Sequence, residues 1–386
     1  MQLSTDKKMV LLELIKWLNK PNSSHVSVGG YAGTGKTTLI AILRKLIFRQ
    51  QPKLKIAFAS FTGKATQVLA NYLRLVKSVY PQDSVSTIHS LIYTPLVNQA
   101  GVIFGWEKKE KIDASLIVID EASMISQDIW QDLLSYQLPI IAFGDHGQLP
   151  PISGHFSLMS HPDYKLETIH RQLKDNPIIK LSIMARETGN IPVGRYSNQV
   201  EKIAVDDIEA QEKISELMTE ISPDTLVLCG YNSTRVKLNQ EIRQQLGFLT
   251  EEPQAGDRVI CLRNNHQTQL YNGMLGTLQH LQSESKKWLQ AEIKLDDRDN
   301  LYFGQILTSQ FNSTTPLNFS QQRAKTLQGD LFDYGYTLTV HKAQGTQAKR
   351  VLLFEQRFPK MSDDDWRKWL YTAVTRAQEE LLIVGQ

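Results

Sequence analysis

Residues 25–37 run from a short apolar segment through a glycine-rich loop into a helical pattern. The segment HVSVGG leads into GYAGTGKT, and KTTLIAILRKLIF then spaces its apolar residues so that they share one helical face. A strand that passes through such a loop into a helix is the repeating unit of parallel α/β folds. This feature constrains the fold most, because a parallel strand needs neighbouring strands and covering helices from elsewhere in the chain.

Similar apolar runs recur along the chain and predict two parallel sheets. In the first half they occupy residues 55–60, 115–120 and 139–144. In the second half they occupy residues 225–230, 336–341, 350–354 and 380–385. Short, continuously apolar strands that alternate with helices are typical of sheets covered on both faces. We therefore predict an α/β protein with two lobes.

Two segments differ in pattern from the lobes that they interrupt. Residues 257–333 contain short strands such as DRVICL and WLQAEIKL with turn signals between them, and predict a small all-β insertion. Residues 91–112 interrupt the first lobe and predict a β-hairpin. The expected boundaries are 1–90 with 113–188 for the first lobe, 189–256 with 334–386 for the second, and 91–112 and 257–333 for the insertions.

Composition excludes several classes of protein. Apolar residues make up 41% and charged residues 22% of the 386 residues, which is ordinary for a soluble globular chain. The net charge of +3 permits a nucleic-acid partner without arguing for one. Cys229 and Cys261 form no CxxC pair, so we expect a reducing compartment and neither a zinc site nor a disulfide framework. The sequence indicates no signal peptide and no membrane span.

The loop GYAGTGKT at 30–37 matches the phosphate-loop pattern G-x-x-x-x-G-K-[ST], with the required strand before it and helix after it. Its glycines would let backbone N–H groups surround phosphate oxygens at the positive end of the helix. Lys36 would reach the β- and γ-phosphates, and the Thr37 hydroxyl would bind Mg²⁺. We predict a single ATP site that includes Gly30, Gly33, Thr34, Gly35, Lys36, Thr37 and Thr38.

The segment LIVIDEAS at 116–123 supplies the carboxylates that such a site needs. Its strand places Asp120 at the carboxyl end, where Asp120 would hold Mg²⁺ directly or through water. Glu121 is the natural base to orient and activate a water molecule. Without the phosphate loop, the same pair would indicate only a solvated strand end.

Gln148 lies in GDHGQLPPI, after the apolar run at 139–144 and before two prolines. Because it follows a parallel strand, we expect it at the sheet edge that carries the phosphate loop. Its amide would hydrogen-bond a γ-phosphate or the attacking water and lose that bond after hydrolysis. The prolines would transmit a movement of Gln148 to the following segment. From chemistry alone, an ordinary turn amide explains the residue equally well.

Eight segments in this order resemble the motifs of superfamily 1 helicases, in the RecD-like or Dda-type branch called superfamily 1B. They are GYAGTGKTT, SFTGKATQVL, STIHSLI, IDEASMI, GDHGQLPPI, TIHRQ, TVHKAQGTQ and YTAVTRAQ. The resemblance covers most of the chain. It implies two RecA-like lobes, a strand-separating hairpin at 91–112 and an SH3-like insertion at 257–333. The length and the hairpin position are similar to those of the compact Dda-type phage enzymes.

The resemblance also implies roles for individual residues. Arg171 and Arg376 would each face the γ-phosphate, one from each lobe, because a guanidinium matches phosphate oxygens. Phe104 and Trp106 would stack on the first unpaired base, although packing against the lobe explains them as well. The implied path of single-stranded DNA follows Thr62, Lys64, Thr87, His89, His341 and Lys342.

Two positions depart from the family pattern. Relatives carry an adenine-recognising Gln in an N-terminal segment that here holds Asp6 and Lys7. Many relatives have an acidic residue near the ribose where this chain has Gln347, whose amide can still bind a hydroxyl.

Polar residues after the strand at 225–230 resemble a further motif of the second lobe. Asn232 and Arg235 carry this likeness. Asn239 and Arg243 would lie on the following helix, where they could face either solvent or ligand.

We therefore expect an ATP- and Mg²⁺-dependent DNA helicase that moves 5′ to 3′ on single-stranded DNA and unwinds duplex. Two alternatives stay open. One is an ATP-gated single-strand translocase or protein remodeller that does not unwind, and the other is an RNA helicase, because backbone-tracking sites discriminate poorly. The expected partners are single-stranded DNA and single-strand/duplex junctions, with replication or recombination proteins as candidates. We expect a cytoplasmic monomer, in a bacterial or phage-infected cell, with no membrane partner.

Overall fold

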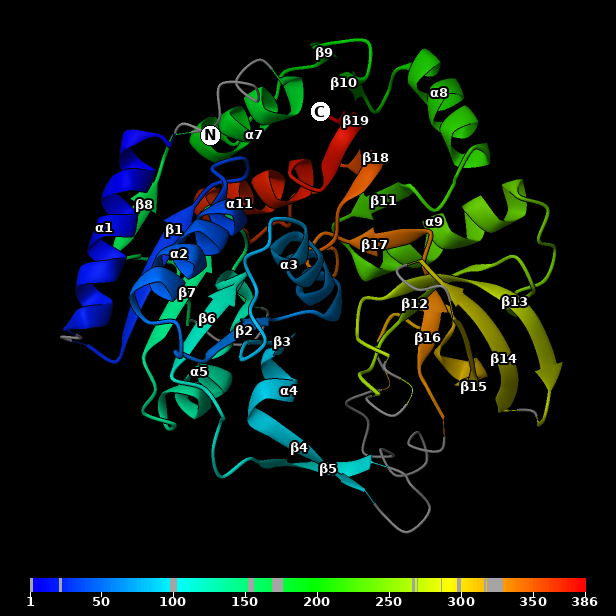
Figure 1. Ribbon diagram of the computed structural model, residues 1–386. Coiled ribbons are helices and arrows are strands. Elements are labelled where there is room, and N and C mark those ends of the chain that lie inside the picture. The colour runs from blue at the N-terminus through cyan, green and yellow to red at the C-terminus, as the bar shows by residue number, and fades with distance from the viewer. Residues whose placement is uncertain are drawn as a thin grey trace. The chain divides into compact units, whose positions relative to one another are not determined.

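The structure is a computed structural model. It describes residues 3–20, 23–97, 103–151, 156–168, 176–265, 268, 270–285, 287–296, 300–315, 317 and 329–386. The chain forms two compact units, of which the first comprises residues 1–94 and 106–180 and the second residues 95–105 and 181–386. Each unit contains one mainly parallel sheet, and the second unit also contains an antiparallel sheet (Figure 1).

The first unit is built on a six-stranded sheet in the order β3-β2-β6-β7-β1-β8. Every paired neighbour in it runs parallel. The strands are β1 (His25–Gly30), β2 (Ile56–Ser60), β3 (Ser84–Thr87), β6 (Leu116–Asp120), β7 (Ile140–Gly144) and β8 (Tyr164–Leu166). Because β7 lies between β1 and β6, the segments that follow these three strands meet at the carboxyl edge of the sheet.

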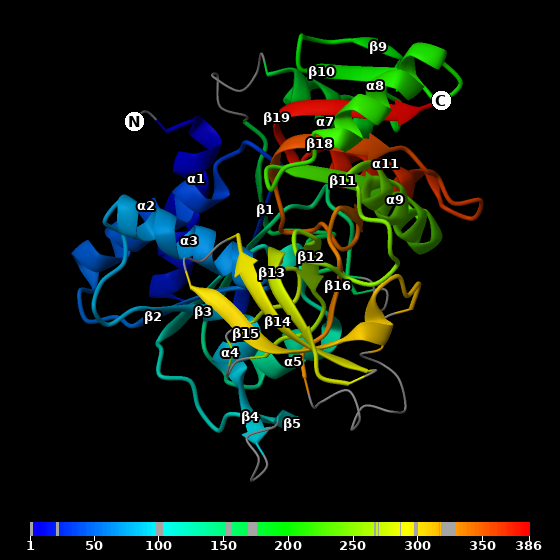
Figure 2. The ribbon, with the colours of Figure 1, turned by 90° about the vertical axis from the view of Figure 1, so that its right-hand side faces the viewer.

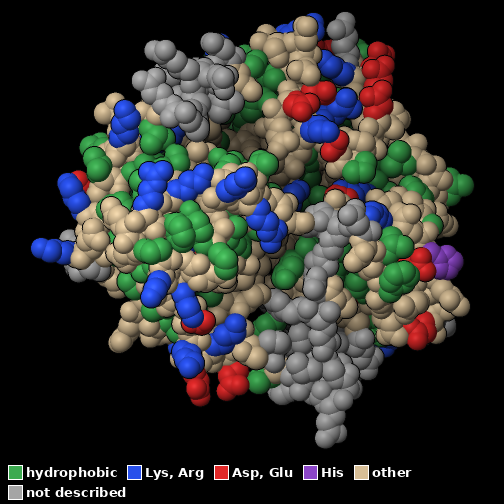
Figure 3. All heavy atoms as spheres, viewed as in Figure 1, with side chains coloured by type: hydrophobic (Ala, Val, Ile, Leu, Met, Phe, Trp, Pro, Cys, Tyr) green, Lys and Arg blue, Asp and Glu red, His purple; other side chains and the backbone are tan. Residues whose placement is uncertain are grey.

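Helices cover both faces of this sheet. One face packs against α1 (Thr5–Asn19), α2 (Lys36–Gln50) and α3 (Gly63–Leu75), and the other against α4 (Ile88–Ile92), the 3₁₀ turn η1 (Ala122–Met124) and α5 (Gln127–Leu134). Phe58 and Val118 belong to the first core, and their neighbours Ala57 and Ile117 to the second. Alternate residues of a strand point to opposite faces, so continuously apolar strands supply both layers. Lys and Arg side chains gather over α2 and α3 on the face drawn in Figure 3.

The second unit contains a six-stranded sheet in the order β17-β11-β18-β19-β10-β9. All its pairs are parallel except that of β9 with β10. The strands are β9 (Gly194–Arg195), β10 (Val200–Ala204), β11 (Thr225–Cys229), β17 (Thr337–Thr339), β18 (Ala348–Phe354) and β19 (Ala377–Gly385). The helices of this part of the chain are α7 (Pro177–Thr188), α8 (Ile208–Thr219), α9 (Asn232–Gln245) and α11 (Asp363–Val374).

An antiparallel sheet is inserted into the second unit between α9 and β17 (Figure 2). Its order is β15-β14-β13-β12-β16, from β12 (Arg258–Cys261), β13 (Leu275–Ser283), β14 (Trp288–Leu295), β15 (Leu301–Leu307) and β16 (Phe332–Tyr334), with the 3₁₀ turn η2 (Thr308–Gln310) after β15. Leu278 and Ile293 of the insertion share one hydrophobic core with Val227 and Leu352 of the parallel sheet. The insertion is therefore packed on its host sheet.

A two-stranded hairpin interrupts the first unit, formed by β4 (Tyr93–Val97) and β5 (Ile103–Lys108). The predicted fold class is confirmed, with two parallel sheets, a hairpin and an antiparallel β insertion. The label SH3-like and the domain boundaries stay predictions. No described helix combines the length and the apolarity that crossing a bilayer requires.

Each of the eight apolar runs forms a strand, but four strands of the two six-stranded sheets were missed by the sequence reasoning. They are β3, β8, β9 and β10, with the sequences SVST, YKL, GR and VEKIA. β3 and β8 lie at the two ends of the first sheet and β10 is next to the last strand of the second. Strands near a sheet edge are partly exposed, so their sequences lack the continuous apolar character of central strands.

Candidate functional site

The loop between β1 and α2 is tightly closed on itself. Gly33 and Gly35 have φ angles of 77° and 78°, in the left-handed region that glycine adopts without strain. The fully buried Thr34 hydroxyl donates to the carbonyl of Tyr31 at 2.7 Å. A Cβ atom at Gly30 would lie 2.7 Å from Thr34 Oγ1, so the loop needs glycine at this position.

The Lys36 side chain lies back over this loop. Its Nζ atom donates to the carbonyl oxygens of Gly30 at 2.6 Å and Tyr31 at 3.3 Å. The same atom lies 3.8 Å from Asp145 Oδ2. The ammonium group is therefore held at the N-terminus of α2, where an anion would also be favoured by the helix dipole.

Thr37 and Asp120 come together at the same edge. The Thr37 hydroxyl donates to Asp120 Oδ2 at 3.1 Å. Burial raises the pKa of the Asp120 carboxyl, while the nearby Lys36 ammonium acts in the opposite direction. Thr38 instead forms a hydrogen bond of 2.9 Å with the hydroxyl of Tyr72 on α3.

The pair of Thr37 and Asp120 fits a magnesium ion. A hydroxyl and a carboxylate are the protein oxygens that commonly hold Mg²⁺ beside nucleotide phosphates and water. Among the described residues, no three His, Cys, Asp or Glu side chains are grouped so as to hold a metal by themselves. An ion at this edge would therefore need phosphate oxygens and water as further ligands.

Glu121 adopts a backbone conformation that is uncommon for its residue type. Its φ and ψ angles are 57° and 38°, and its N–H donates to Asp120 Oδ1 at 3.0 Å. Left-handed residues other than glycine are strained and tend to cluster at functional sites. The conformation turns the chain sharply after β6, directly beside the Thr37 and Asp120 pair.

Gln148 is buried, and one half of its amide is bound within its own turn. Its Nε2 donates to Asp145 Oδ2 at 3.3 Å, whereas its buried Oε1 has no hydrogen-bond partner among the described residues. The backbone N–H of Gly147 donates to Asp145 Oδ1 at 2.9 Å. An unsatisfied buried acceptor is costly, which makes Gln148 Oε1 a candidate for binding a water molecule or a ligand donor.

Asp145 is the residue of this site that sequence reasoning missed. Its buried carboxylate contacts both Lys36 Nζ and Gln148 Nε2 through Oδ2. The available signal was its position directly after β7, one strand away from the phosphate loop. Asp145 thus links two side chains that the sequence had assigned separate roles.

In the second unit, Arg376 is buried at the junction of α11 and β19. Its Nε donates to the Thr372 carbonyl at 2.9 Å, its Nη1 to the Thr346 carbonyl at 3.2 Å and its Nη2 to Thr375 Oγ1 at 3.0 Å. The exposed Gln347 lies nearby and donates to the Thr375 carbonyl at 3.5 Å.

The structure does not describe the side chains of two predicted site residues. Arg171 lies outside the described residues. The side chain of Phe104 also lies outside them, whereas its hairpin neighbour Trp106 is described and half-buried.

The first-unit residues on the proposed DNA path follow the carboxyl ends of β2 and β3. Thr62 Oγ1 accepts from the Ala65 N–H at 3.2 Å and so caps α3. Thr87 Oγ1 caps α4 by accepting from the Ser90 N–H at 3.1 Å. The other two predicted contacts in this unit, Lys64 and His89, are half-buried beside these caps. Both hydroxyls therefore have a structural function as N-caps.

His341 and Lys342 lie in the turn after β17. Burial lowers the pKa of the His341 imidazole. Burial, together with the nearby Arg235 guanidinium, lowers the pKa of Lys342 to about 8, while Asp333 acts to raise it. Lys342 is thus a cation whose charge depends on pH in the neutral to mildly basic range.

Three polar residues of α9 are buried within the second unit. Arg235, Asn239 and Arg243 are all buried, and they lie four residues apart on one side of the helix. They bind the chain where it enters and leaves the β insertion. The alternative that Asn239 and Arg243 face solvent is therefore wrong.

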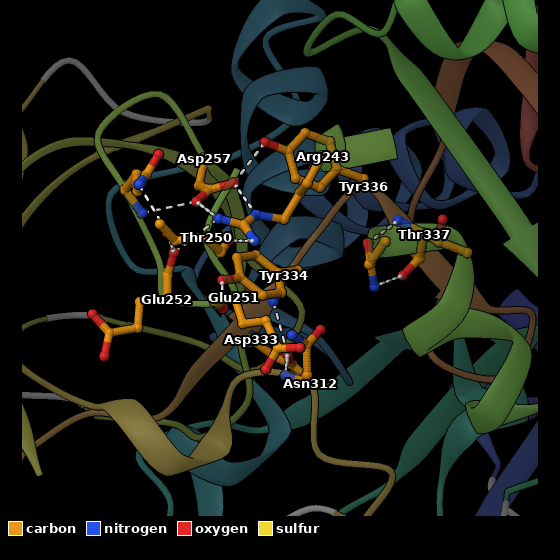
Figure 4. Close-up of polar contacts among 12 residues, drawn as sticks. Arg243, Thr250, Glu251, Glu252, Asp257, Asn312, Asp333, Tyr334, Tyr336 and Thr337 are labelled. Carbon is orange, nitrogen blue, oxygen red and sulfur yellow. Dashed lines mark hydrogen bonds and ion pairs between the residues drawn. The ribbon is translucent and has the colours of Figure 1, made fainter. Parts of the chain in front are cut away.

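Each of these contacts joins α9 to a different point of that connection. Arg235 Nη1 donates to Asp333 Oδ2 at 2.8 Å, and the Thr337 N–H donates to Asn239 Oδ1 at 2.9 Å. Figure 4 shows Arg243 facing Asp257, with distances of 2.8 Å from Nε to Oδ1 and 3.0 Å from Nη2 to Oδ2.

Asp6 ties the first helix to the segment after β8. Its Oδ2 atom accepts from the backbone N–H groups of Glu167 at 3.2 Å and Thr168 at 3.0 Å. The Lys7 side chain beside it is buried, and burial lowers its pKa. The segment that holds Asp6 and Lys7 is thus part of a packed helix end.

Two protein families match this chain, one in its first half and one near its end. Residues 18–154 match the AAA domain family, and residues 334–384 match the UvrD-like helicase C-terminal domain. These two segments contain the phosphate loop, Asp120 and Gln148 in one case and Lys342 and Arg376 in the other.

Curated relatives align with most of the chain at low identity. The chain is 25% identical to the ATP-dependent RecD2 DNA helicase of Deinococcus radiodurans, over 93% of this chain and 47% of that protein. It is 24% identical to the RecD subunit of the RecBCD enzyme of Mycobacterium tuberculosis, over 92% of this chain and 66% of that protein. The ATP-dependent DNA helicase dda of Enterobacteria phage T4 is 29% identical over 43% of this chain and 39% of its own length. The chain thus spans about half to two thirds of its first two relatives.

Solved structures support the fold. Bacteroides Pif1 bound to single-stranded DNA has a TM-score of 0.56 and 17% identity, covering 99% of this chain and 92% of that one. Pif1 helicase from Candida albicans has a TM-score of 0.50 at the same 17% identity, covering 100% and 95%. At this level of identity, the likeness shows a shared fold.

Proposed function

We propose that this chain, a superfamily 1B helicase of the RecD, Dda and Pif1 type, hydrolyses ATP to move 5′ to 3′ along single-stranded DNA and to separate duplex strands. The observation that carries the proposal is the meeting of Lys36, Thr37, Asp120 and Gln148 at one sheet edge. Within this group, Thr37 Oγ1 lies 3.1 Å from Asp120 Oδ2, and Lys36 and Gln148 share the Asp145 carboxylate. The relatives with DNA helicase names, and the Pif1 structures with single-stranded and forked DNA, support DNA as the polymer.

In this proposal the loop glycines and Lys36 bind the phosphates of ATP. Mg²⁺, held by Thr37 Oγ1 and Asp120, would neutralise phosphate charge during hydrolysis. Glu121 orients the attacking water as general base, from a position directly after Asp120, whose Oδ1 accepts from the Glu121 N–H. Arg171 and Arg376 are proposed to stabilise charge on the transferred phosphoryl group.

Gln148 is proposed as the residue that responds to the γ-phosphate. Its Oε1 can accept a hydrogen bond from a water molecule, while its Nε2 donor can leave Asp145 for a phosphate oxygen. Movement of Gln148 would carry the following Leu149 and Pro150 with it. Such an exchange of partners supplies the state-dependent contact that a switch requires.

The DNA path is proposed to follow Thr62, Lys64, Thr87, His89, His341 and Lys342, with Phe104 and Trp106 of the hairpin at the strand junction. In the first unit these residues flank the N-termini of α3 and α4, where backbone N–H groups and hydroxyls suit phosphate contact. Replacing both hairpin aromatics with Ala should reduce unwinding more than single-strand-stimulated ATP hydrolysis. An equal loss of both activities would contradict the assignment of the hairpin.

The decisive experiment is strand displacement with ATP and Mg²⁺ on two duplexes that differ only in the polarity of a single-stranded tail. Unwinding from the 5′ tail alone is the expected result. Unwinding from the 3′ tail alone would keep the motor and overturn the direction. DNA-stimulated ATP hydrolysis without unwinding would favour a translocase or protein remodeller, and stronger stimulation by RNA than by DNA would favour an RNA helicase.

A further inference from the structure

A surface of the first unit carries positive charge that the proposed function does not use. Residues 14–82 contain eleven Lys and Arg residues and no Asp or Glu. Acidic residues number 40 in the 386-residue chain, so this gap departs strongly from the average composition. Exposed cations elsewhere commonly have acidic partners, such as Asp224 for Lys349 and Glu201 for Lys213.

Five cations of this segment form what we call the basic face: Lys45, Arg49, Lys53, Arg74 and Lys77. All five side chains are exposed, and none has a hydrogen bond or an ion pair with a described residue. Lys45 and Arg49 are four residues apart on α2, so their side chains lie on the same side of the helix. The basic face is therefore a group of cations without counter-charges in the part of the chain that the structure describes.

Contacts between the two chain segments hold these cations on one surface. The ring of Phe48, between Lys45 and Arg49, stacks on Tyr80 with centroids 3.7 Å apart. Gln82 Nε2 donates to the Pro52 carbonyl at 2.7 Å. The end of α2 and its following turn are thus packed against the segment that follows α3, which brings the two groups of cations together.

The basic face lies away from the nucleotide site. It surrounds the C-terminal ends of α2 and α3, which precede the amino ends of β2 and β3. Lys36 and Asp120 lie at the opposite, carboxyl edge of the same sheet, as do Thr62 and Thr87. The basic face is therefore a separate surface from both the ATP site and the proposed single-strand path.

Helix dipoles account for only part of this charge. A cation in the last turn of a helix is favoured by the negative end of the dipole, which explains Arg49 of α2 and Arg74 of α3. Lys53 and Lys77 lie beyond the helix ends, and Lys45 lies before the last turn of α2. These three cations need another reason for lacking carboxylate partners.

We propose that the basic face binds the phosphate backbone of duplex DNA. Lys and Arg contacts to phosphates supply affinity without sequence preference. Single-strand sites also need exposed aromatic rings for base stacking, but Phe48 and Tyr80 stack on each other, and the Arg44 guanidinium lies 4.5 Å from the Tyr80 ring centroid. A duplex presents phosphates and hides its base faces, so it fits a surface of cations without free rings. The proposal deepens the proposed function, on which it rests for DNA as the polymer.

The test compares two triple variants of the full chain that remove the same amount of charge. The first is Lys45→Gln, Arg49→Gln, Lys53→Gln, and the control is Lys213→Gln, Lys349→Gln, Lys368→Gln, whose lysines pair with carboxylates in the second unit. Binding of a labelled blunt duplex and of a short oligo-dT is measured across a salt series, with dT-stimulated ATP hydrolysis measured in parallel.

The first variant should bind duplex roughly tenfold more weakly at moderate salt, and its slope of log affinity against log salt should fall by about one for each cation removed. Its oligo-dT affinity and dT-stimulated hydrolysis should match those of the unchanged chain. Equal losses in the control variant, or unchanged duplex binding in the first, would overturn the proposal. If oligo-dT does not stimulate ATP hydrolysis by the unchanged chain, the proposed function is contradicted instead. The failure of the basic face and the failure of the proposed function are therefore distinct.

Discussion

Two junctions of this molecule have the same order of strand, loop and helix. They differ because a side chain of the chain itself binds the backbone N–H groups of the second junction. In the first unit β1 leads through residues 31–35 into α2, and in the second β11 leads through residues 230–231 into α9. The N-cap of α2 is Gly35, which has no side chain to offer its helix. At the second junction Gln356 Oε1 accepts from the N–H of Gly230 at 2.9 Å and of Tyr231 at 3.4 Å.

The comparison shows what a strand, a loop and a helix need in order to bind phosphate. Both junctions place backbone N–H groups at a positive helix end. At the second junction, a side chain of the same chain takes the place of an external anion, and its Nε2 donates to Thr234 Oγ1 at 3.1 Å on the same helix. We infer that the longer loop of the first junction suits a phosphate, whereas the Gln356 side chain already binds the N–H groups of the second.

The largest expected effect comes from a substitution at the first junction, the loop between β1 and α2. Lys36→Ala removes the cation that lies over the loop carbonyls and that is proposed to meet the phosphates of ATP. DNA-stimulated phosphate release should fall by at least about a hundredfold, since charge stabilisation in such sites is worth this much. Lys349→Ala, at an exposed ion pair of the second unit, is the control. Retained turnover in Lys36→Ala would remove the basis for the nucleotide site.

A second prediction concerns the stability of α9, the helix that follows the second junction. Arg243→Met leaves the buried Asp257 without its cation and should lower the free energy of unfolding by about 3–5 kcal/mol. Arg357→Met, at the exposed pair with Asp363, should change the free energy of unfolding much less. Urea unfolding measures both values. Similar costs for the two variants would show that the polar side of α9 does not fasten the insertion.

A paired glycine test sharpens the comparison. In Gly30→Ala the new Cβ atom would lie 2.7 Å from Thr34 Oγ1, inside the phosphate loop, so KM for ATP should rise. In Gly230→Ala it would lie 3.0 Å from Gln356 Cβ, so stability should fall by about 1–3 kcal/mol while KM stays unchanged. Steady-state kinetics and thermal unfolding of both variants are the measurements. A change of KM in Gly230→Ala would mean that the second junction contributes to nucleotide binding.

The smallest expected effect is a pH dependence at Lys342. Its pKa of about 8 means that it loses its charge between pH 7 and 9, so affinity for single-stranded DNA should fall a few-fold over this range. The lowered pKa also means that the unfolded chain binds more protons above pH 8, so this residue makes stability rise as pH increases toward 10.5. Lys342→Arg should remove the pH dependence of DNA binding, because arginine stays charged. A wild-type affinity that is flat from pH 7 to 9 would contradict the proposed contact.

Sequence pattern was sufficient where local chemistry decides the structure. The central strands β1, β6 and β7 are continuously apolar, and the glycines of the phosphate loop are required by its left-handed turns. The resulting strand order puts Asp120 beside Thr37, which pattern alone had suggested. In the central strands and the phosphate loop, burial or local backbone geometry requires the residue type.

Pattern was insufficient where the partner lies far away in the sequence. The helix sequence NSTRVKLNQEIRQQ is polar enough to suggest a solvated helix, yet Arg235 and Asn239 are buried against residues about a hundred positions later. Asp145 was passed over because its role depends on Lys36 and Gln148 meeting at one oxygen. A single sequence gives the residue types but not which distant charges will meet.

The left-handed backbone of Glu121 has a consequence for laboratory evolution. A residue other than glycine in this conformation costs about 1–2 kcal/mol, so Glu121→Gly should relieve strain, while it also removes the proposed base. Selection for heat resistance alone would therefore favour variants that no longer hydrolyse ATP. A screen for stabilised forms of this chain needs to hold position 121 constant, because a change that relieves strain there also removes the proposed base.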